Sequence, residues 1–220
     1  MAGAGYRTRV WDLPTRLFHW ALVILVITSF VTAKVGGNAM TWHMYSGYAI
    51  LTLVLFRVVW GFVGGRESRF ASFVKGPGAV VRYLGTLFDR KAAHHAGHNP
   101  LGGWSVVLMI LSLGTQAGTG LFASDDIFVE GPLAAKVSGA TVTLATRIHH
   151  WNEWVLIALV ALHVAAILFY AVYKRENLVH AMVHGHKVLP APGEHVPNRT
   201  LLAAVIVGIG GALVYWLVRA

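Results

Sequence analysis

The chain has 220 residues, of which 56% are hydrophobic and 12% are charged, and its formal net charge is +9. This composition is too apolar for an ordinary soluble domain. The chain has no cysteine, which excludes disulfides, thiolate-held iron–sulfur clusters and covalently attached c-type haem.

Five runs that are nearly free of charge succeed one another along the chain. They cover residues 13–33, 42–63, 101–123, 149–173 and 201–218. Each is near the ~20 residues that a helix needs to cross the hydrocarbon core of a bilayer. The first run is too long for a typical signal-peptide core and has no clear small-x-small cleavage pattern. We therefore expect an all-α transmembrane helical bundle with a four-helix core at residues 1–175. A cytoplasmic linker at 176–198 and a C-terminal transmembrane helix at 199–220 complete the chain.

The basic residues gather in alternate connections between these runs, which indicates the orientation. Those that precede the first run, or come after the second and fourth, are Arg7, Arg9, Arg16, Arg66, Arg69, Lys75, Arg82, Arg90, Lys91, Lys174, Arg175, Lys187 and Arg199. The opposite connections hold Lys34, Lys136 and Arg147, together with the acidic Asp125, Asp126 and Glu130. By the positive-inside rule, the N-terminus is cytoplasmic and the C-terminus lies outside. The charge is thus explained by the membrane, and no nucleic acid is expected as a partner.

Three connecting segments have a recognisable character. Residues 76–88 place apolar side chains close to helical spacing beside Arg82, which predicts a helix in the cytoplasmic interface. Residues 124–146 form the longest outer connection. Before the last run, Pro190, Pro192 and Pro197 predict an irregular link.

The fourth run contains histidines, which are costly in hydrocarbon and therefore suggest a function. His149 and His163 are fourteen residues apart, or nearly four helical turns, so they share one face about 21 Å apart along the axis. His150 falls off this face, so an interfacial position explains it better.

Alternation of the helices pairs these histidines with two others. His19 lies near the cytoplasmic start of the first run, and His43 lies near the outer start of the second. Because the fourth run enters from the outside, we expect His43 to meet His149 at the outer level. His163 then meets His19 at the inner level.

Paired imidazoles across an apolar bundle favour haem iron. Zinc usually takes four ligands, and the runs offer few carboxylates and no cysteine. Haem iron takes two axial ligands, and its porphyrin fills the space between helices. The glycines that could give a porphyrin room are Gly47, one turn after His43, and Gly114, Gly118 and Gly120 in the third run. Close helix packing explains these glycines equally well.

Two arginines are candidates for binding haem propionates. Arg57 stands fourteen residues after His43, on the same face and near the cytoplasmic end of its run. A guanidinium can bind a carboxylate through two hydrogen bonds, although snorkelling to the headgroups is the alternative. Arg16 precedes His19 by three residues and could act in the same way.

Four segments within residues 10–173 together resemble the bacterial cytochrome b561 family: VWDLPTRLFHW, WHMYSGYAILTLVLFRVVWGFVGG, GHNPLGGWSVVLMILSLGTQAGTGLF and HHWNEWVLIALVALHVA. That family includes the b-type cytochrome subunits of nickel–iron hydrogenases and related dehydrogenases. The resemblance implies a lipid-embedded protein of the bacterial inner membrane with two b haems. These carry electrons between a quinone, ubiquinone or menaquinone, and a periplasmic cytochrome c or a dehydrogenase or hydrogenase subunit.

In the same family the positions of the haem ligands match His19, His43, His149 and His163. Relatives often have an acidic residue directly after the outer histidine of the fourth run, whereas this chain has His150. The resemblance therefore implies an outer site that is tuned differently.

Other functions stay open on the sequence alone. Some relatives of this size oxidise superoxide and reduce ubiquinone on their own, although Asp125 and Asp126 would repel an anion at the outer end. A metal transporter with a histidine relay is a third possibility. His94, His95, His98, His180, His184 and His186 lie outside the runs and are explained best as solvated or headgroup-facing side chains. The sequence does not decide whether the chain is itself an enzyme.

Overall fold

The computed structural model describes residues 5–90, 95–125, 129–190 and 197–219. Its long helices are α1 (Leu13–Val35), α2 (Met40–Val63), α5 (Pro100–Gly120), α6 (Gly139–Val172) and α8 (Thr200–Arg219). All five are long and apolar enough to cross a membrane, as expected. Four residues that carry sequence predictions, Lys91, His94, Asp126 and Pro192, lie outside the described residues.

Polar caps explain where three of these helices begin. The side chains of Asp12, Asn99 and Ser138 accept hydrogen bonds from backbone N–H groups in the first turns of α1, α5 and α6. Because Ser138 caps α6, this helix starts ten residues before the predicted position 149. The connection between α5 and α6 therefore ends at residue 138 and not at the predicted 146, and it is still longer than the connection between α1 and α2. It contains the short 3₁₀ helix η3 (Ala134–Lys136) and a bridge between Ser124 and Glu130.

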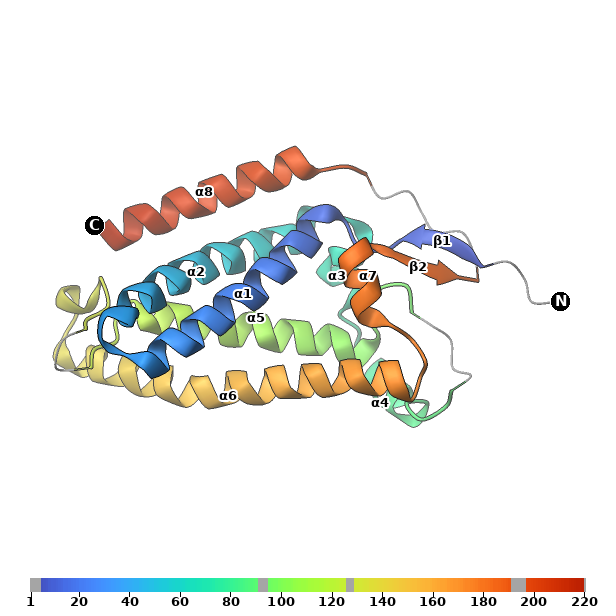
Figure 1. Cartoon of the computed structure of the whole chain (residues 1–220), viewed down its shortest axis with the longest axis horizontal. Coiled ribbons are helices and arrows are strands. Elements are labelled where there is room, and N and C mark those ends of the chain that lie inside the picture. Colours follow the sequence, from blue (N-terminus) through green and yellow to red (C-terminus); the bar gives the residue numbers. More distant parts are fainter. Residues whose placement is uncertain (1–4, 91–94, 126–128, 191–196, 220) are drawn as a thin grey trace.

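The long helices lie side by side in a fixed order. α1 packs along α2, α2 along α5, and α5 along α6, while α8 lies against α2 on the outside of this group (Figure 1). Ile50, Val54 and Leu113 join α2 to α5, and Phe56, Trp60 and Ala203 join α2 to α8. The helices α1, α2, α5 and α6 therefore enclose the space between the predicted histidines.

Short elements gather at the end of the bundle that carries the N-terminus. They are β1 (Tyr6–Arg9), η2 (Arg66–Ser68), α3 (Phe70–Phe73), α4 (Pro77–Gly85), α7 (Leu178–His184) and β2 (His186–Leu189), whereas η1 (Gly37–Ala39) joins α1 to α2 at the opposite end. β1 and β2 pair antiparallel, with Arg9 opposite His186. The linker predicted at 176–198 thus holds a helix and a strand before Pro190. Gly185, with a φ of 82°, ends α7 and lets the chain turn into β2.

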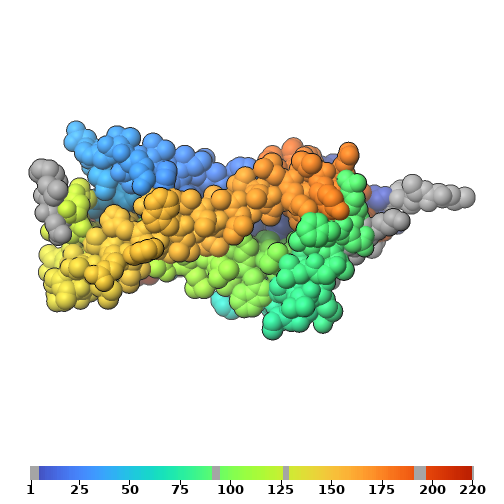
Figure 2. Space-filling model, turned by 90° about the horizontal axis from the view of Figure 1, so that it is seen from below, coloured from blue at the N-terminus to red at the C-terminus, as the bar shows by residue number. Residues whose placement is uncertain are grey.

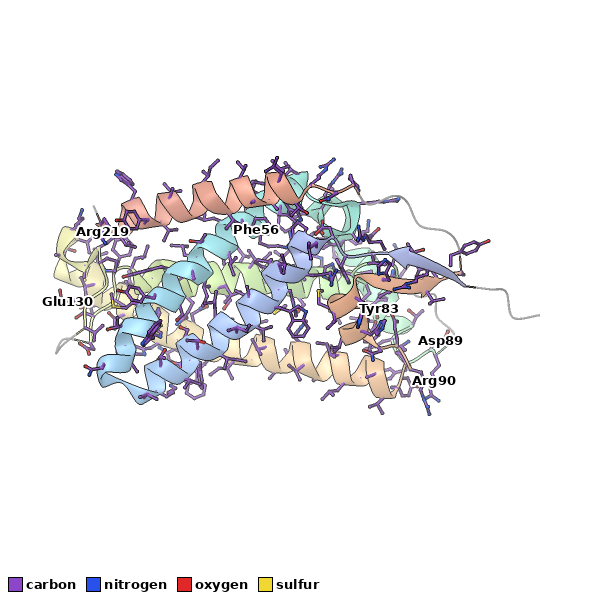
Figure 3. The ribbon with its side chains drawn as sticks, turned by 45° about the horizontal axis from the view of Figure 1, so that its top comes forward. Phe56, Tyr83, Asp89, Arg90, Glu130 and Arg219 are labelled. Atoms are coloured by element: carbon purple, nitrogen blue, oxygen red, sulfur yellow. The ribbon has the colours of Figure 1, made fainter. Side chains whose placement is uncertain are left out.

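The predicted interfacial helix at 76–88 is confirmed as a helix by α4. It lies beside the end of α6, where the two helices form adjoining surfaces (Figure 2). The hydroxyl groups of Tyr83 and Tyr170 are hydrogen-bonded, and Arg90 Nε donates to the carbonyl oxygen of Tyr173 at 2.9 Å. Tyr83 and Arg90 lie at one end of the molecule, opposite Glu130 and Arg219 (Figure 3).

Candidate functional site

Two pairs of histidines meet between the helices, as the spacing predicts. His19 of α1 faces His163 of α6 with 6.3 Å between their ring centroids. His43 of α2 faces His149 of α6 with a centroid separation of 6.2 Å. One helix, α6, therefore contributes a member to each of two levels, which its length separates by about 21 Å.

The pair of His43 and His149, at the level predicted to be the outer one, is called the outer pair, and His19 with His163 the inner pair. The outer pair is oriented by its neighbours. Nδ1 of His43 lies 2.9 Å from the carbonyl oxygen of Ser29 and 3.1 Å from its hydroxyl. Nδ1 of His149 lies 2.9 Å from the carbonyl oxygen of Gln116. A carbonyl oxygen can only accept, so each Nδ1 carries the proton and each Nε2 keeps a free lone pair. This is the tautomer that a metal-binding imidazole needs, held by a backbone acceptor.

An amide cluster between α5 and α6 supports His149. Asn152 Nδ2 donates to the carbonyl oxygen of Ser112 at 2.9 Å and to Gln116 Oε1 at 2.8 Å. Ser112 Oγ donates to Asn152 Oδ1 at 3.1 Å. These bonds hold α5 against α6 one turn beyond His149. Gln116 and Asn152 were not predicted from the sequence, although paired amides in apolar runs are a usable signal.

The inner pair has fewer partners. Nδ1 of His19 is buried and has no hydrogen-bond partner among the described residues. The ring of Trp20 lies edge-on to His19, with 5.1 Å between centroids. The two levels therefore differ in the groups around their imidazoles.

The distances between the paired histidine rings, and the two imidazole donors at each level, fit haem iron. Two imidazole–metal bonds of about 2.0 Å each, with the ring radii added, place the ring centroids about 6 Å apart. The described residues contain no group of three or more histidine or acidic side chains that could hold a metal ion by itself. His19 and His163 would hold one haem, and His43 and His149 the other.

The predicted glycines differ in their surroundings. A Cβ atom at Gly47 or Gly118 would meet nothing within 4 Å, which leaves room for a flat ring against α2 and α5. At Gly120 it would lie 3.1 Å from Cε1 of His149, and at Gly114 it would lie 3.7 Å from Val54. Gly120 thus lets the His149 ring approach α5, whereas Gly114 makes an ordinary packing contact.

The two predicted arginines have different environments. Arg57 is only 3% exposed, and its Nη1 has no hydrogen-bond partner among the described residues. Its guanidinium lies 5.0 Å from the ring centroid of Phe70. Arg16, by contrast, donates to the carbonyl oxygens of Met182 and Val183 at the end of α7. Arg57 therefore offers a buried donor, and a role of Arg16 toward a propionate stays a prediction.

The remaining histidines divide into exposed and buried ones. His150 is exposed, with its ring edge-on to His149, which agrees with an interfacial position. The exposed His180 and His184 stack with 4.3 Å between centroids. His98 differs from the expected solvated state, because its Nδ1 is buried without a partner in the described chain.

His98 is uncharged in this environment. Burial, together with the positive charges of Arg57 and Lys187, lowers the pKa of His98 to about 3. A neutral imidazole carries one N–H donor and one acceptor. His98 therefore brings a neutral polar group to the inner end of the bundle.

Comparison with known proteins agrees with this geometry. The family model described as prokaryotic cytochrome b561 matches residues 10–185. Relatives named "probable Ni/Fe-hydrogenase B-type cytochrome subunit" occur in Azotobacter chroococcum mcd 1 and Cupriavidus necator. They are 24% and 23% identical over 81% and 82% of this chain and 88% and 86% of their own length.

The corresponding hydrogenase 1 subunit of Escherichia coli K12 is 26% identical, over 81% of this chain and 89% of the relative. No solved structure matches the chain. The family match covers most of the chain, and the structure has the expected spans with paired histidines between them. This chain is therefore a membrane b-type cytochrome of the prokaryotic cytochrome b561 family.

Proposed function

We propose that this protein carries electrons across the bacterial inner membrane through two b haems, between the quinone pool and a redox partner. The observation that supports this proposal is the presence of two histidine pairs with matching separations, 6.2 and 6.3 Å, at two levels of one bundle. A single pair would serve one redox centre. Two pairs about 21 Å apart along α6 provide a relay through the hydrocarbon core.

The chain's own residues hold and insulate the two sites. The carbonyl oxygens of Ser29 and Gln116 fix the tautomers of His43 and His149. The apolar side chains of Ile50, Val54 and Leu113 pack between the levels and exclude water. Haem iron, when bound, supplies reversible one-electron transfer.

A hydrogenase subunit is the partner that the relatives favour. Three relatives from different bacteria are named as hydrogenase cytochrome subunits, and each aligns over most of its length. We therefore place this chain beside a hydrogenase or a similar dehydrogenase, with a quinone as the other reactant. The relatives give no comparable support to the superoxide alternative or to a periplasmic cytochrome c.

Alanine replacement of each ligand tests the two-site proposal. The pyridine haemochrome spectrum of the purified protein should give two b haems per chain. His43→Ala or His149→Ala should remove the outer haem, and His19→Ala or His163→Ala the inner one, so that each variant keeps about half the haem. A Soret band that stays intact in all four variants would refute the proposal.

His150→Ala is the matched control, because this neighbour of His149 is exposed. It should keep both haems. If His150→Ala removes a haem and His149→Ala does not, the outer ligand has been assigned to the wrong residue.

The partner is tested separately from the haems. Membranes that contain the protein should show haem reduction on addition of a quinol, or of a nickel–iron hydrogenase together with hydrogen. A protein with two haems that neither reactant reduces would keep the cytochrome assignment and overturn the proposed reactants.

A further inference from the structure

Three buried nitrogen atoms at the end of the bundle that carries the N-terminus have no hydrogen-bond partner among the described residues. One is Nδ1 of His19, in the inner pair, and the others are Nη1 of Arg57, near the end of α2, and Nδ1 of His98, in the segment before α5. A buried polar group without a hydrogen bond is unfavourable, so the nitrogens of Arg57 and His98 together point to an acceptor that the described residues do not supply.

The two side chains share one aromatic wall. The ring of Phe73 lies 4.8 Å from the ring centroid of His98 and 5.7 Å from the Arg57 guanidinium. Trp11 covers His98 from another side, with 4.9 Å between centroids. Phe73 is itself 2% exposed, so this wall is fixed within the core.

A close backbone contact holds the wall in place. A Cβ atom at Gly103 of α5 would lie 2.5 Å from the carbonyl oxygen of Phe73, so only glycine permits this approach. His98 stands five residues before Gly103. It directly precedes Asn99, whose side chain caps the start of α5. The position of His98 beside Phe73 is therefore built into the packing of α3 against α5.

The carboxylate of Asp12, whose charge acts on Arg57, is already engaged. Asp12 is 6% exposed and accepts from Thr15 N, Trp60 Nε1 and Gly65 N at 2.7, 3.2 and 3.1 Å, with Ser68 Oγ at 3.4 Å. Its oxygens are occupied by these donors. Among the described residues, neither Nη1 of Arg57 nor Nδ1 of His98 has a hydrogen-bond partner, so an acceptor from a bound group would suit both.

Charge and position identify the kind of acceptor. The guanidinium is cationic, and the imidazole can add a neutral N–H donor, so together they suit a carboxylate. His98 is also close enough to interact electrostatically with His19 and His163, the inner pair. A carboxylate here would belong to whatever group those two histidines hold.

We propose that His98 and Arg57 together bind a propionate carboxylate of the inner haem, with His98 donating from Nδ1. This inference depends on the proposed di-haem function. In this inference His98 is a positioning residue for the inner haem, and it lies in the connection before α5, outside the spans. It also predicts that His98 affects the reduction potential of the inner haem and leaves the outer haem unchanged.

The test compares two replacements of His98, which separate the effect of its ring packing from the effect of its N–H donor. His98→Phe keeps an aromatic ring between Trp11 and Phe73 but removes the N–H. His98→Asn loses the ring but keeps an amide N–H near the position of Nδ1. His95→Phe is the control, since His95 is exposed and lies in the same connection.

Redox titration of each purified protein, monitored by haem absorbance, gives the two potentials. Without the N–H donor of His98, the negative charge of the carboxylate is less neutralised. This negative charge stabilises ferric iron over ferrous iron. His98→Phe should therefore lower the potential of one haem by an amount that corresponds to about a tenfold change in equilibrium constant, or ~59 mV. His98→Asn should restore most of this shift, and His95→Phe should match the unmodified protein.

Each other outcome has a defined meaning. Loss of the inner haem from His98→Phe but not from His98→Asn also supports the proposal. Unchanged potentials in His98→Phe overturn it, as does an equal shift or equal haem loss in both variants, because the ring's packing would then be responsible. If the unmodified protein holds no haem at His19 and His163, the di-haem function fails first, and haem content shows this before any titration.

Discussion

At the scale of single residues, polar atoms in this apolar bundle are held by backbone groups. His43 and His149 each use a main-chain carbonyl, and Asp12 receives main-chain N–H groups at the start of α1 and after α2. The positions of these backbone groups are fixed by the helices to which they belong. The orientation of these side chains is therefore determined as soon as the helices pack.

Asp12 provides a prediction at this scale. Asp12→Asn replaces two acceptor oxygens by one oxygen and one N–H₂ group, so the amide faces at least one of the present donors with another donor. We expect a loss of about 1–3 kcal/mol in unfolding free energy, because a buried hydrogen bond becomes a buried unpaired group. Thermal denaturation in detergent measures this loss.

The exposed Glu130 provides the control for that experiment. Glu130→Gln should denature at the temperature of the unmodified protein. If both variants behave alike, the four donors around Asp12 contribute little to stability.

The sequence predicts residues that repeat along a helix better than residues that meet across the fold. The pairing of His19 with His163 is expected from spacing and alternation, and the structure brings them together. The burial of His98 depends on Trp11 and Phe73, which are distant in sequence, so no local pattern reveals it.

At the scale of elements, the five spans are predictable from hydropathy, whereas their ends and the short elements are not. α6 begins at Gly139 because Ser138 caps it, although the segment from 139 to 148 is less apolar than the rest of the helix. The pairing of β1 with β2 joins positions about 180 residues apart. Local patterns carry no information on such contacts, so the strand pair is missed.

Gly47 of α2 provides a prediction at the element scale. A Cβ atom there meets nothing within 4 Å, and the residue lies one turn after His43. If the outer porphyrin lies against this face, Gly47→Leu should remove the outer haem while the protein still inserts and elutes as a single species. The haem-to-protein ratio of the purified variant measures the effect.

Gly208→Leu is the matched control for Gly47→Leu. Gly208 lies in α8, which carries none of the four histidines, and a Cβ atom there also meets nothing within 4 Å. This variant should keep both haems. Retention of both haems in Gly47→Leu would show that no porphyrin lies against this face of α2.

At the scale of the whole molecule, α8 is attached to the outside of a core that already contains all four histidines. It covers Phe56 and Trp60 of α2 through Ala203, and Arg199 donates to the carbonyl oxygen of Val63. In lipid, exposure of apolar side chains on α2 is tolerated. The prediction of a separate C-terminal helix at 199–220 can therefore be tested by removing it.

Truncation after residue 198 should leave two haems per chain and lower the denaturation temperature. The haems remain because His19, His43, His149 and His163 belong to α1, α2 and α6. Haemochrome analysis and thermal denaturation in detergent measure the two effects. Loss of either haem would show that α8 is part of the haem-binding core.

The orientation of the molecule is the last prediction, and it depends on charge. Arg175 follows α6, Lys187 belongs to β2 and Arg199 precedes α8, and these elements meet at the end of the bundle that holds β1 and α4 (Figure 1). Arg219 lies at the opposite end (Figure 3). Basic residues are retained in the cytoplasm, so we expect the end with Arg90 to be cytoplasmic. A green fluorescent protein fused after residue 198 should fluoresce, and alkaline phosphatase fused after residue 220 should be active, because each reporter works on one side only. The reverse pair of results would invert the bundle and place Arg57 and His98 toward the periplasmic side of the membrane.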